Sequence, residues 1–230
     1  MLRLEALEVR QGSFTLTANV TLDARVTALI GPSGSGKSTL LNAVAGFVTP
    51  ATGHILWHTQ DITAATPAAR PVSMLFQDNN LFPHLTVDEN IALALTHRRP
   101  SDAQRTAMVA ALDRVGLSGF GARRPGTLSG GQQSRAALAR VMLQNRPLVL
   151  LDEPFAALGP ALKHDMLDLV ADLAREHGLQ ILMVSHDPAD ALRIADEACV
   201  LADGRISPPQ RTTELLANPP PDLKRYLGDV

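Results

Sequence analysis

The 230-residue sequence predicts an α/β fold with a mainly parallel sheet, an antiparallel β subdomain and an inserted helical lobe. Short, almost continuous apolar runs at 26–30, 148–151 and 181–184 are typical of parallel strands that helices cover on both faces. At 14–22, by contrast, every even position is apolar and most odd positions are polar, which indicates a half-solvated antiparallel strand. A mainly helical stretch at 78–127 interrupts the parallel series.

Helices are expected between the buried strands, and local signals mark their ends. One helix is predicted over 37–45, after a glycine-rich turn. Another is predicted over 160–177, where apolar residues recur at helical spacing before Gly178 ends the element. A further helix should begin after Asp187, with Pro188 in the first turn, where a missing N–H costs nothing.

The inserted helical lobe is placed at 78–145. Within it, Ser101 and Gln104 have the spacing of a capping box, and apolar residues follow at helical spacing. Inserted helical segments in α/β proteins often form a separate lobe around the common core. We therefore interpret residues 1–230 as a single domain that contains this lobe.

Composition and charge exclude several classes of protein. Lys and Arg number 21 against 23 Asp and Glu, and 3% of the residues are aromatic. Nucleic acid is not expected as a partner, because neither a basic excess nor stacking residues are present. The amino terminus lacks the apolar core of a secretory signal, and no run of about 18 apolar residues occurs. The protein should stay in the cytosol and reach a membrane only through a partner, and Cys199 should be a buried strand residue.

The first chemical motif, G-x-x-x-x-G-K-[ST], lies at 31–38 between a buried strand and a helix. Its glycines let backbone N–H groups surround phosphate oxygens, while Lys37 can reach the β- and γ-phosphates and Ser38 can hold Mg²⁺. A simple glycine-rich turn with an exposed lysine is the alternative, which the complete spacing disfavours. The residues expected to bind nucleotide here are Gly31, Pro32, Ser33, Gly34, Ser35, Gly36, Lys37, Ser38 and Thr39.

The second motif, LVLLDEP at 148–154, delivers two acids to the end of a strand. Asp152 can help to hold Mg²⁺, and Glu153 can polarise an attacking water. An acidic pair after a strand is by itself more often the start of a solvated loop. Together with the phosphate loop, however, it predicts a P-loop NTPase core that binds ATP and Mg²⁺.

The third motif, LSGGQ, predicts a second anion site at a helix start, formed by Ser129, Gly130, Gly131 and Gln132. A nucleotide that is already held at 31–38 does not need a second anion site. A second molecule would explain why the chain has this site. At this point the sequence resembles the ATP-binding cassette family over essentially its whole length. Gln77 matches the glutamine loop of that family and His186 its switch histidine, in the expected order with the other motifs.

The resemblance implies a head-to-tail homodimer in which two ATP molecules lie between the phosphate loop of one subunit and the signature of the other. It implies that Asp152 and Gln77 serve the magnesium ion together with Ser38. It also implies that Glu153 is the catalytic acid, that His186 contacts the γ-phosphate, and that Gln77 connects the site to the helical lobe.

Two departures from the family pattern stand out. The family's usual Ser-Ala-Leu-Asp loop is replaced by Ala-Ala-Leu-Gly at 156–159, so Gly159 removes a carboxylate that couples the two sites in relatives. Reduced turnover or cooperativity is expected. The family also places an aromatic residue near the amino terminus to stack on adenine, where this chain has Arg10 or Gln11. Phe14 is the nearest aromatic residue, and it fits stacking and core packing equally well.

The resemblance further implies integral membrane permease subunits as partners, with a periplasmic or extracellular substrate-binding protein in the full complex. The chain would then lie on the cytoplasmic face of the inner (plasma) membrane, attached through those subunits. The run at 70–95 resembles the ATPases of bacterial thiamine importers, whereas 14–22 is somewhat similar to molybdate-importer ATPases. Import of thiamine or its phosphates is favoured. Molybdate, iron or polyamine importers, exporters, and soluble cassettes in iron–sulfur assembly are the alternatives.

Overall fold

The computed structural model describes residues 1–156 and 158–227, whose strands form a single 11-stranded sheet. The strands are β1 (Leu2–Gln11), β2 (Phe14–Leu22), β3 (Val26–Ile30), β4 (Thr52–Trp57), β5 (Gln60–Asp61), β6 (Val72–Leu75), β7 (Leu148–Asp152), β8 (Gln180–Val184), β9 (Glu197–Ala202), β10 (Arg205–Ile206) and β11 (Gln210–Arg211). Their order is β5-β4-β1-β2-β10-β9-β3-β8-β7-β6, and β11 pairs with β9.

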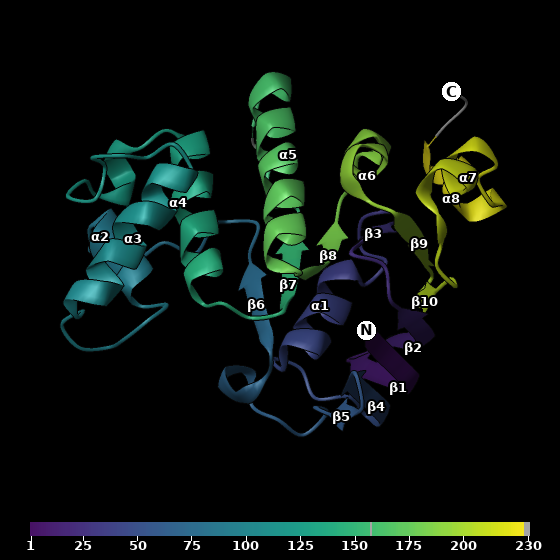
Figure 1. The fold of residues 1–230 in the computed structure, drawn as a ribbon. Helices are drawn as coiled ribbons and strands as arrows, with labels where there is room; N and C mark the ends of the chain where they lie inside the picture. The colour runs from purple at the N-terminus through teal and green to yellow at the C-terminus, as the bar shows by residue number, and fades with distance from the viewer. Residues whose placement is uncertain (157, 228–230) are drawn as a thin grey trace.

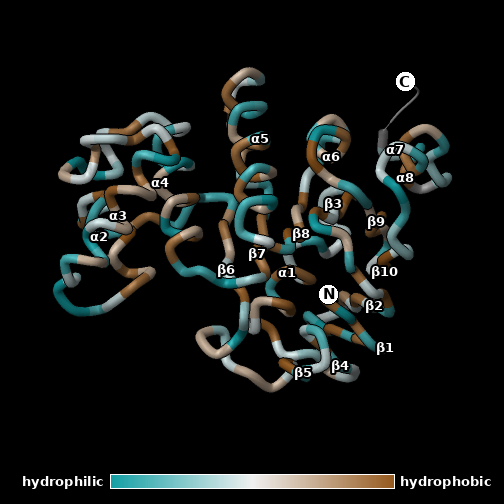
Figure 2. The backbone as a smooth tube through the Cα atoms, viewed as in Figure 1, coloured by the Kyte–Doolittle hydropathy of each residue, from teal (hydrophilic) through white to brown (hydrophobic). Residues whose placement is uncertain are grey.

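The sheet has a parallel part and an antiparallel part, as the two strand patterns predict. β9, β3, β8, β7 and β6 pair in parallel, and every residue of β3, β7 and β8 is buried. β1, β2, β4 and β5 pair antiparallel, and the even positions of β2 from 16 to 22 are buried while the odd ones are exposed. The hydrophobic runs of β7 and β8 lie near the centre of the molecule (Figure 2).

Strand β1 is an element that the sequence analysis did not predict. Its buried positions are even at Leu2 and Leu4 but odd at Leu7 and Val9. The register with both neighbouring strands shifts between these pairs, where Ala6 has a φ of 44°. A bulge of this kind places an extra residue in one strand and changes which positions face inward. The simple alternation is therefore broken within the strand.

The helices are α1 (Lys37–Ala45), α2 (Val87–Ala92), α3 (Asp102–Arg114), α4 (Gly130–Leu143), α5 (Pro160–His177), α6 (Pro188–Ile194), α7 (Thr212–Ala217) and α8 (Pro221–Leu227), with 3₁₀ turns at Pro67–Ala69 and Pro125–Thr127. The expected bounds of α1 and α5 are confirmed. Ser101 forms the expected capping box with Gln104, and the side chain of Asp187 caps α6.

The stretch at 78–127 is less helical than predicted. It holds α2, α3 and one 3₁₀ turn, joined by long turns. Pro83 and Pro100 lie in the first two of these turns and Gly116 and Gly119 in the third, and these residue types disfavour a continuous helix.

The helices cover the sheet in three groups (Figure 1). The helices α2, α3 and α4 gather to one side and share a core with α5, β7 and β8. Helix α1 packs between the antiparallel strands and β7, and α6, α7 and α8 cover β3 and β9. We propose that residues 78–145 form a lobe within a single domain, and these bounds stay a prediction.

A buried arginine ties the end of α1 to the neighbouring loop. The guanidinium of Arg70 donates hydrogen bonds to the backbone oxygens of Ala43 (2.7 Å) and Val44 (2.8 Å), near the end of the helix, and to that of Thr63 (2.8 Å). Carbonyls in the last turn of a helix lack partners within the helix and carry partial negative charge. Arg70 therefore stabilises the helix whose first residue is Lys37.

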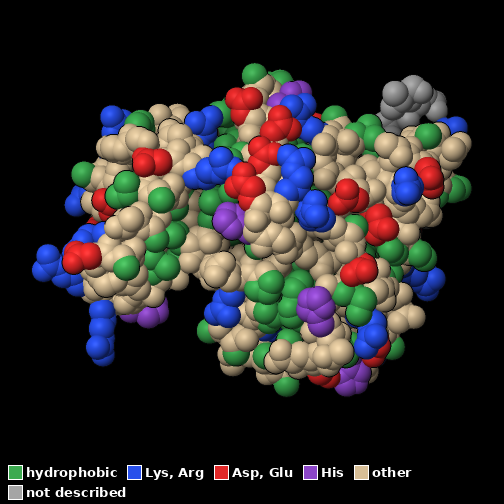
Figure 3. Space-filling view, in the orientation of Figure 1, with side chains coloured by type: hydrophobic (Ala, Val, Ile, Leu, Met, Phe, Trp, Pro, Cys, Tyr) green, Lys and Arg blue, Asp and Glu red, His purple; other side chains and the backbone are tan. Residues whose placement is uncertain are grey.

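Two other observations concern charge and burial. On the face shown in Figure 3, acidic and basic side chains are interspersed over α5. Asp168 of this helix forms an exposed ion pair with Arg193 of α6 (2.6 Å). Cys199 is buried in β9, and burial raises the pKa of its thiol to about 12, which agrees with a structural role.

Among the residues that the structure describes, no helix has the length and apolar composition needed to cross a membrane.

Candidate functional site

The phosphate loop connects β3 to α1, and Lys37 begins the helix. Its buried side chain donates hydrogen bonds from Nζ to the backbone oxygens of Gly31 (2.8 Å) and Pro32 (2.9 Å). Burial lowers the pKa of Lys37, and the charges of Glu153 and Asp152 oppose that shift. The ammonium group is thus held inside the loop, where it can exchange carbonyl contacts for phosphate oxygens.

The loop requires glycine at position 36. Gly36 is the N-cap of α1 with a φ of 105°, and an added Cβ would lie 2.7 Å from Cζ of Phe14. As a glycine, it supplies no side-chain cap, so the N–H groups of the first turn are available to an anion. Phe14 is half-buried and packs against this loop. That contact favours the packing role of Phe14 over adenine stacking.

Ser38 and Asp152 form the part of the site that fits a magnesium ion. Ser38 Oγ donates a hydrogen bond to Asp152 Oδ1 (3.2 Å). Burial raises the pKa of Asp152, and the hydrogen bond from Ser38 opposes this shift. Mg²⁺ prefers oxygen ligands and usually keeps several waters beside one or two carboxylates and substrate phosphates. The hydroxyl and the buried carboxylate fit this pattern, and a cation there would relieve the cost of burying Asp152.

The described residues place no larger metal centre beside this pair. In the described part of the chain, no group of three or more His, Cys, Asp and Glu side chains is placed to hold a metal ion. An ion at Ser38 and Asp152 therefore needs further oxygen ligands from a bound phosphate or from water.

Glu153 and His186 face one another at the ends of β7 and β8. Glu153 Oε2 lies 3.2 Å from Nδ1 of His186, whose ring is half exposed. Glu153 has a φ of 45°, and its backbone N–H donates to the oxygen of Val184 (3.2 Å). A left-handed backbone is uncommon for a residue with a side chain, and such strain is frequent at functional sites.

Parallel pairing explains why these distant segments meet. β6 and β7 pair through Leu75 and Leu151, and Gln77 and Glu153 each lie two residues beyond that pair. His186 lies two residues beyond the last residue of β8 that pairs with β7. β3 is also parallel to β8, so the phosphate loop leaves the sheet at the same edge. Ligands of open α/β sheets bind at this carboxyl edge.

The LSGGQ segment forms the start of α4, in the group of helices beside the sheet (Figure 1). Ser129 Oγ accepts a hydrogen bond from the N–H of Gln132 (3.3 Å), and Gln132 Oε1 accepts one from the N–H of Ser129 (3.0 Å). Gly130 is exposed, whereas an added Cβ at Gly131 would lie 2.3 Å from Cδ2 of Leu162 in α5. Ser129 and Gly130 therefore face solvent, and Gly131 permits close packing of α4 on α5.

Comparison with known proteins identifies the family. The sequence pattern of the ABC transporter family matches residues 17–156, which is more than half of the chain. The chain belongs to the ABC transporter family. Its α/β fold and the resemblance noted in the sequence are thereby confirmed.

Relatives of this ABC chain match it along its whole length. The thiamine import ATP-binding proteins ThiQ of Ruegeria sp. (strain TM1040) and of Cereibacter sphaeroides are each 56% identical over 230 residues, which cover 99% of this chain and 100% of each relative.

Solved ABC cassettes share the fold. The ADP conformation of an ATP-binding cassette is 28% identical with a TM-score of 0.87, covering 100% of this chain and 99% of that one. The dimeric structure of a bacterial ABC transporter cassette is 27% identical with a TM-score of 0.80, covering 92% and 99%.

The departure of this ABC chain at 156–159 lies beside the site. Ala157 falls outside the described residues. Gly159 is the exposed N-cap of α5, and an added Cβ would meet no atom within 4 Å. Packing within the chain therefore does not require glycine there. The expected effect of the missing carboxylate on turnover stays a prediction.

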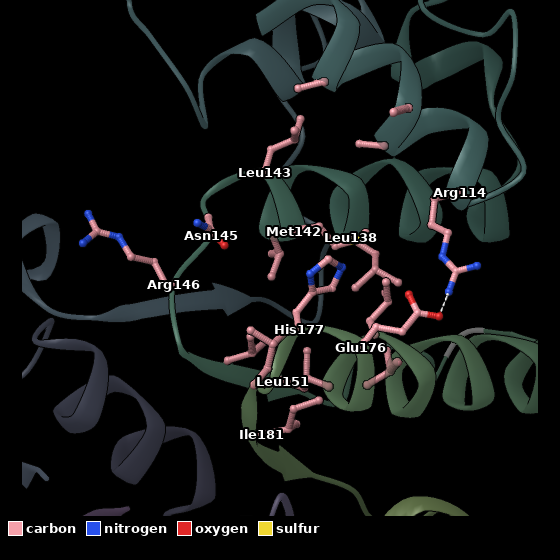
Figure 4. A pocket seen from close by; sticks show the side chains of 18 residues that line it. Arg114, Leu138, Met142, Leu143, Asn145, Arg146, Leu151, Glu176, His177 and Ile181 are labelled. Carbon is pink, nitrogen blue, oxygen red and sulfur yellow. Dashed lines mark hydrogen bonds and ion pairs between the residues drawn. The ribbon is translucent and has the colours of Figure 1, made fainter. Parts of the chain in front are cut away.

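A mostly apolar cavity of the cassette is separate from this site. It has a volume of about 460 Å³ and lies between α3 and α4 on one side and α5, β7 and β8 on the other (Figure 4). Its walls are mostly aliphatic, and they also include His177, Arg146 and the ion pair of Arg114 with Glu176. It shares no lining residue with the phosphate loop, Glu153 or His186, and such walls do not suit nucleotide phosphates.

Two residues near the site escaped the sequence analysis. The hydroxyl of Tyr226, from α8, reaches the backbone of His186, and Lys163 of α5 contacts Asp187. Neither residue belongs to a motif, and each approaches through tertiary packing. No local pattern in the sequence signals these contacts.

Proposed function

We propose that this chain is the ATP-hydrolysing subunit of an importer for thiamine or its phosphates. The identity of 56% to thiamine import ATP-binding proteins over full lengths carries the proposal. The chain is then an ATPase coupled to transport. The same site would serve an importer of molybdate, iron or polyamines, an exporter or a soluble cassette, so the substrate needs a separate test.

The chemistry follows from the geometry of the site. Lys37 and the first N–H groups of α1 bind the phosphates of ATP, and Glu153 accepts a proton from the attacking water. His186, whose imidazole lies beside Glu153, orients that water and contacts the γ-phosphate. Ser38 and Asp152, with Gln77, would hold Mg²⁺, which neutralises phosphate charge when bound.

A second copy of the chain completes each site. Ser129 and Gly130 are exposed at the start of α4, which makes the hydroxyl of Ser129 and the N–H of Gly130 available to the nucleotide of another subunit. A similar cassette has been solved as a dimer, which supports this arrangement. Two head-to-tail copies then form two composite sites.

A groove beside the site suits a permease subunit. It has a volume of about 530 Å³ and is lined by the end of α1, by β6 and by the segments after α2 and α4. Phe47, on its edge, is 57% exposed, and its ring lies 5.9 Å from that of Phe76. Phe76 precedes Gln77, so a helix of the permease in this groove would press on the glutamine of the site. The chain would thus lie on the cytoplasmic face of the membrane, in a complex with a substrate-binding protein.

Phe47→Asp should weaken the association with the permease about tenfold or more, because a charge would replace an exposed aromatic contact at the edge of the groove. ATP binding by the separate chain should not change. Co-purification of a tagged chain from its native membrane measures the effect. Leu192→Asp on α6, where the side chain is 52% exposed and does not line the groove, is the matched control. Equal recovery of the permease by both variants would place the docking surface elsewhere.

Deletion of the gene should abolish most uptake of labelled thiamine at limiting concentration, because the permease would lose its source of energy. Molybdate uptake, measured in parallel, should remain at the parental level. Plasmid-borne parental gene should restore thiamine uptake, whereas the Glu153→Gln form should not. Unchanged thiamine uptake in a strain without a second importer would reject this substrate, and a loss of molybdate uptake alone would favour the alternative.

A further inference from the structure

The turn that carries His186 is held from outside by the last helix of the described chain. The hydroxyl of Tyr226, in α8, donates a hydrogen bond to the backbone oxygen of His186 (2.9 Å). Forty residues separate the two, so the contact depends on how α8 packs. The imidazole on the same residue faces Glu153 at 3.2 Å.

Helix α8 is packed against the core, so it can hold the turn that carries His186. Leu223 is fully buried in a core with residues of β3, β9, α6 and α7. Tyr226 follows three residues later, so the two side chains lie on the same face of the helix. The packing of Leu223 therefore presents the phenol to the turn.

The phenol is suited to donate. Burial raises the pKa of Tyr226, and the negative charges of Glu153 and Asp187 raise it further. The group therefore stays protonated at neutral pH and remains a hydrogen-bond donor to the carbonyl.

The residues on either side of His186 are fixed independently. Ser185 Oγ donates to Asp190 Oδ2 (2.6 Å), and Asp187 Oδ1 accepts from the N–H of Ala189 (2.9 Å). Lys163 Nζ lies 2.7 Å from Asp187 Oδ2 and 2.6 Å from Asp190 Oδ1. Both flanks of the turn are thus held by side chains of α5 and α6.

The carbonyl of His186 is the part of the turn that these flanking contacts do not reach. The N–H of the same peptide, on Asp187, donates to Ser185 Oγ (3.0 Å), so Tyr226 holds the other side of that peptide. Rotation of the peptide between His186 and Asp187 would tilt the imidazole away from Glu153, and the bond from Tyr226 adds to the resistance against that rotation. We propose that Tyr226 is a positioning residue for His186, through which α8 sets the geometry of the hydrolytic site. This inference rests on the proposed ATPase function.

Tyr226→Phe removes the hydroxyl and keeps the ring, so the packing of α8 should persist. The kcat for ATP should fall about two- to tenfold, the factor that corresponds to one ordinary hydrogen bond. The affinity for ATP and the melting temperature should not change. Lys224→Gln, an exposed change on the same helix, should keep the parental kcat. The full-length chain is used throughout, with single-turnover assays to resolve slow rates.

A positioning role through His186 also predicts coupling between the two residues. In a His186→Ala background, Tyr226→Phe should change the rate less than about twofold, because there is no imidazole to orient. The same proportional loss in both backgrounds would overturn the proposal, as would a parental kcat for Tyr226→Phe. If His186→Ala has no measurable rate, the test rests on Tyr226→Phe alone. A lower kcat with an unchanged affinity for ATP then supports the proposal. A parental chain that does not hydrolyse ATP would instead reject the proposed function.

Discussion

Replacement of Glu153 by glutamine is expected to lower ATP hydrolysis by about two to four orders of magnitude, the usual contribution of a positioned general base. The amide keeps the size of the side chain but cannot accept the proton of the attacking water. ATP binding should persist, because the phosphates contact Lys37 and the N–H groups of α1. Glu153 lies beyond those contacts, against His186.

Steady-state hydrolysis by the assembled transporter and ATP binding at equilibrium measure the two halves of this prediction. Glu214→Gln, an exposed change on α7, is the control and should match the parental protein in both. Hydrolysis by Glu153→Gln at the parental rate would show that another group is the base. Loss of ATP binding together with hydrolysis would instead give Glu153 a structural role, which its left-handed backbone makes worth testing.

The elements of the fold that could be predicted are those whose local residue pattern is enough to determine their type and bounds. The first four residues of β7 form a continuous apolar run, and all five of its residues are buried. Helix α5 has helical spacing, a proline at its start and Gly178, with a φ of 62°, at its end. The apolar run, the helical spacing and the terminal proline and glycine each act over a few neighbouring residues. The sequence alone therefore contains the information that sets these elements.

One part that could not be predicted depends on contacts between distant segments. The phase change in β1 comes from a bulge at Ala6, which pairing with β2 and β4 accommodates. In β1, tertiary pairing thus overrides the local period. The turns within 78–127 have a local cause instead, because the prolines and glycines there outweigh the helical spacing of the apolar residues.

The candidate site shows the same division. The phosphate loop and the acids after β7 are contiguous motifs, and their positions at the carboxyl edge follow from parallel strands. The contact of Glu153 with His186 needs the register of β7 with β8, and that of Tyr226 with His186 needs the packing of Leu223. Gly131 has a packing role against Leu162 that its motif does not reveal.

Two chains with different lesions are expected to regain hydrolysis when they are combined. In a head-to-tail dimer, each site pairs the phosphate loop of one subunit with Ser129 of the other. A heterodimer of Lys37→Ala and Ser129→Arg chains then has one site with both lesions and one site with neither. Its rate should be about half the parental rate if the two sites act independently. Each homodimer has a lesion in both sites and should hydrolyse ATP at a small fraction of that rate.

The reciprocal heterodimer makes this test sharp. When a Lys37→Ala, Ser129→Arg double variant is paired with a parental chain, each composite site contains one lesion, so hydrolysis should stay low. If both elements instead served the nucleotide of their own subunit, the parental chain would keep an intact site and the ranking of the two heterodimers would invert. Two affinity tags isolate each heterodimer before the rates are compared, which removes parental homodimers from the measurement. A rate for the reciprocal pair above that of the single-variant pair would therefore place Ser129 in the site of its own chain.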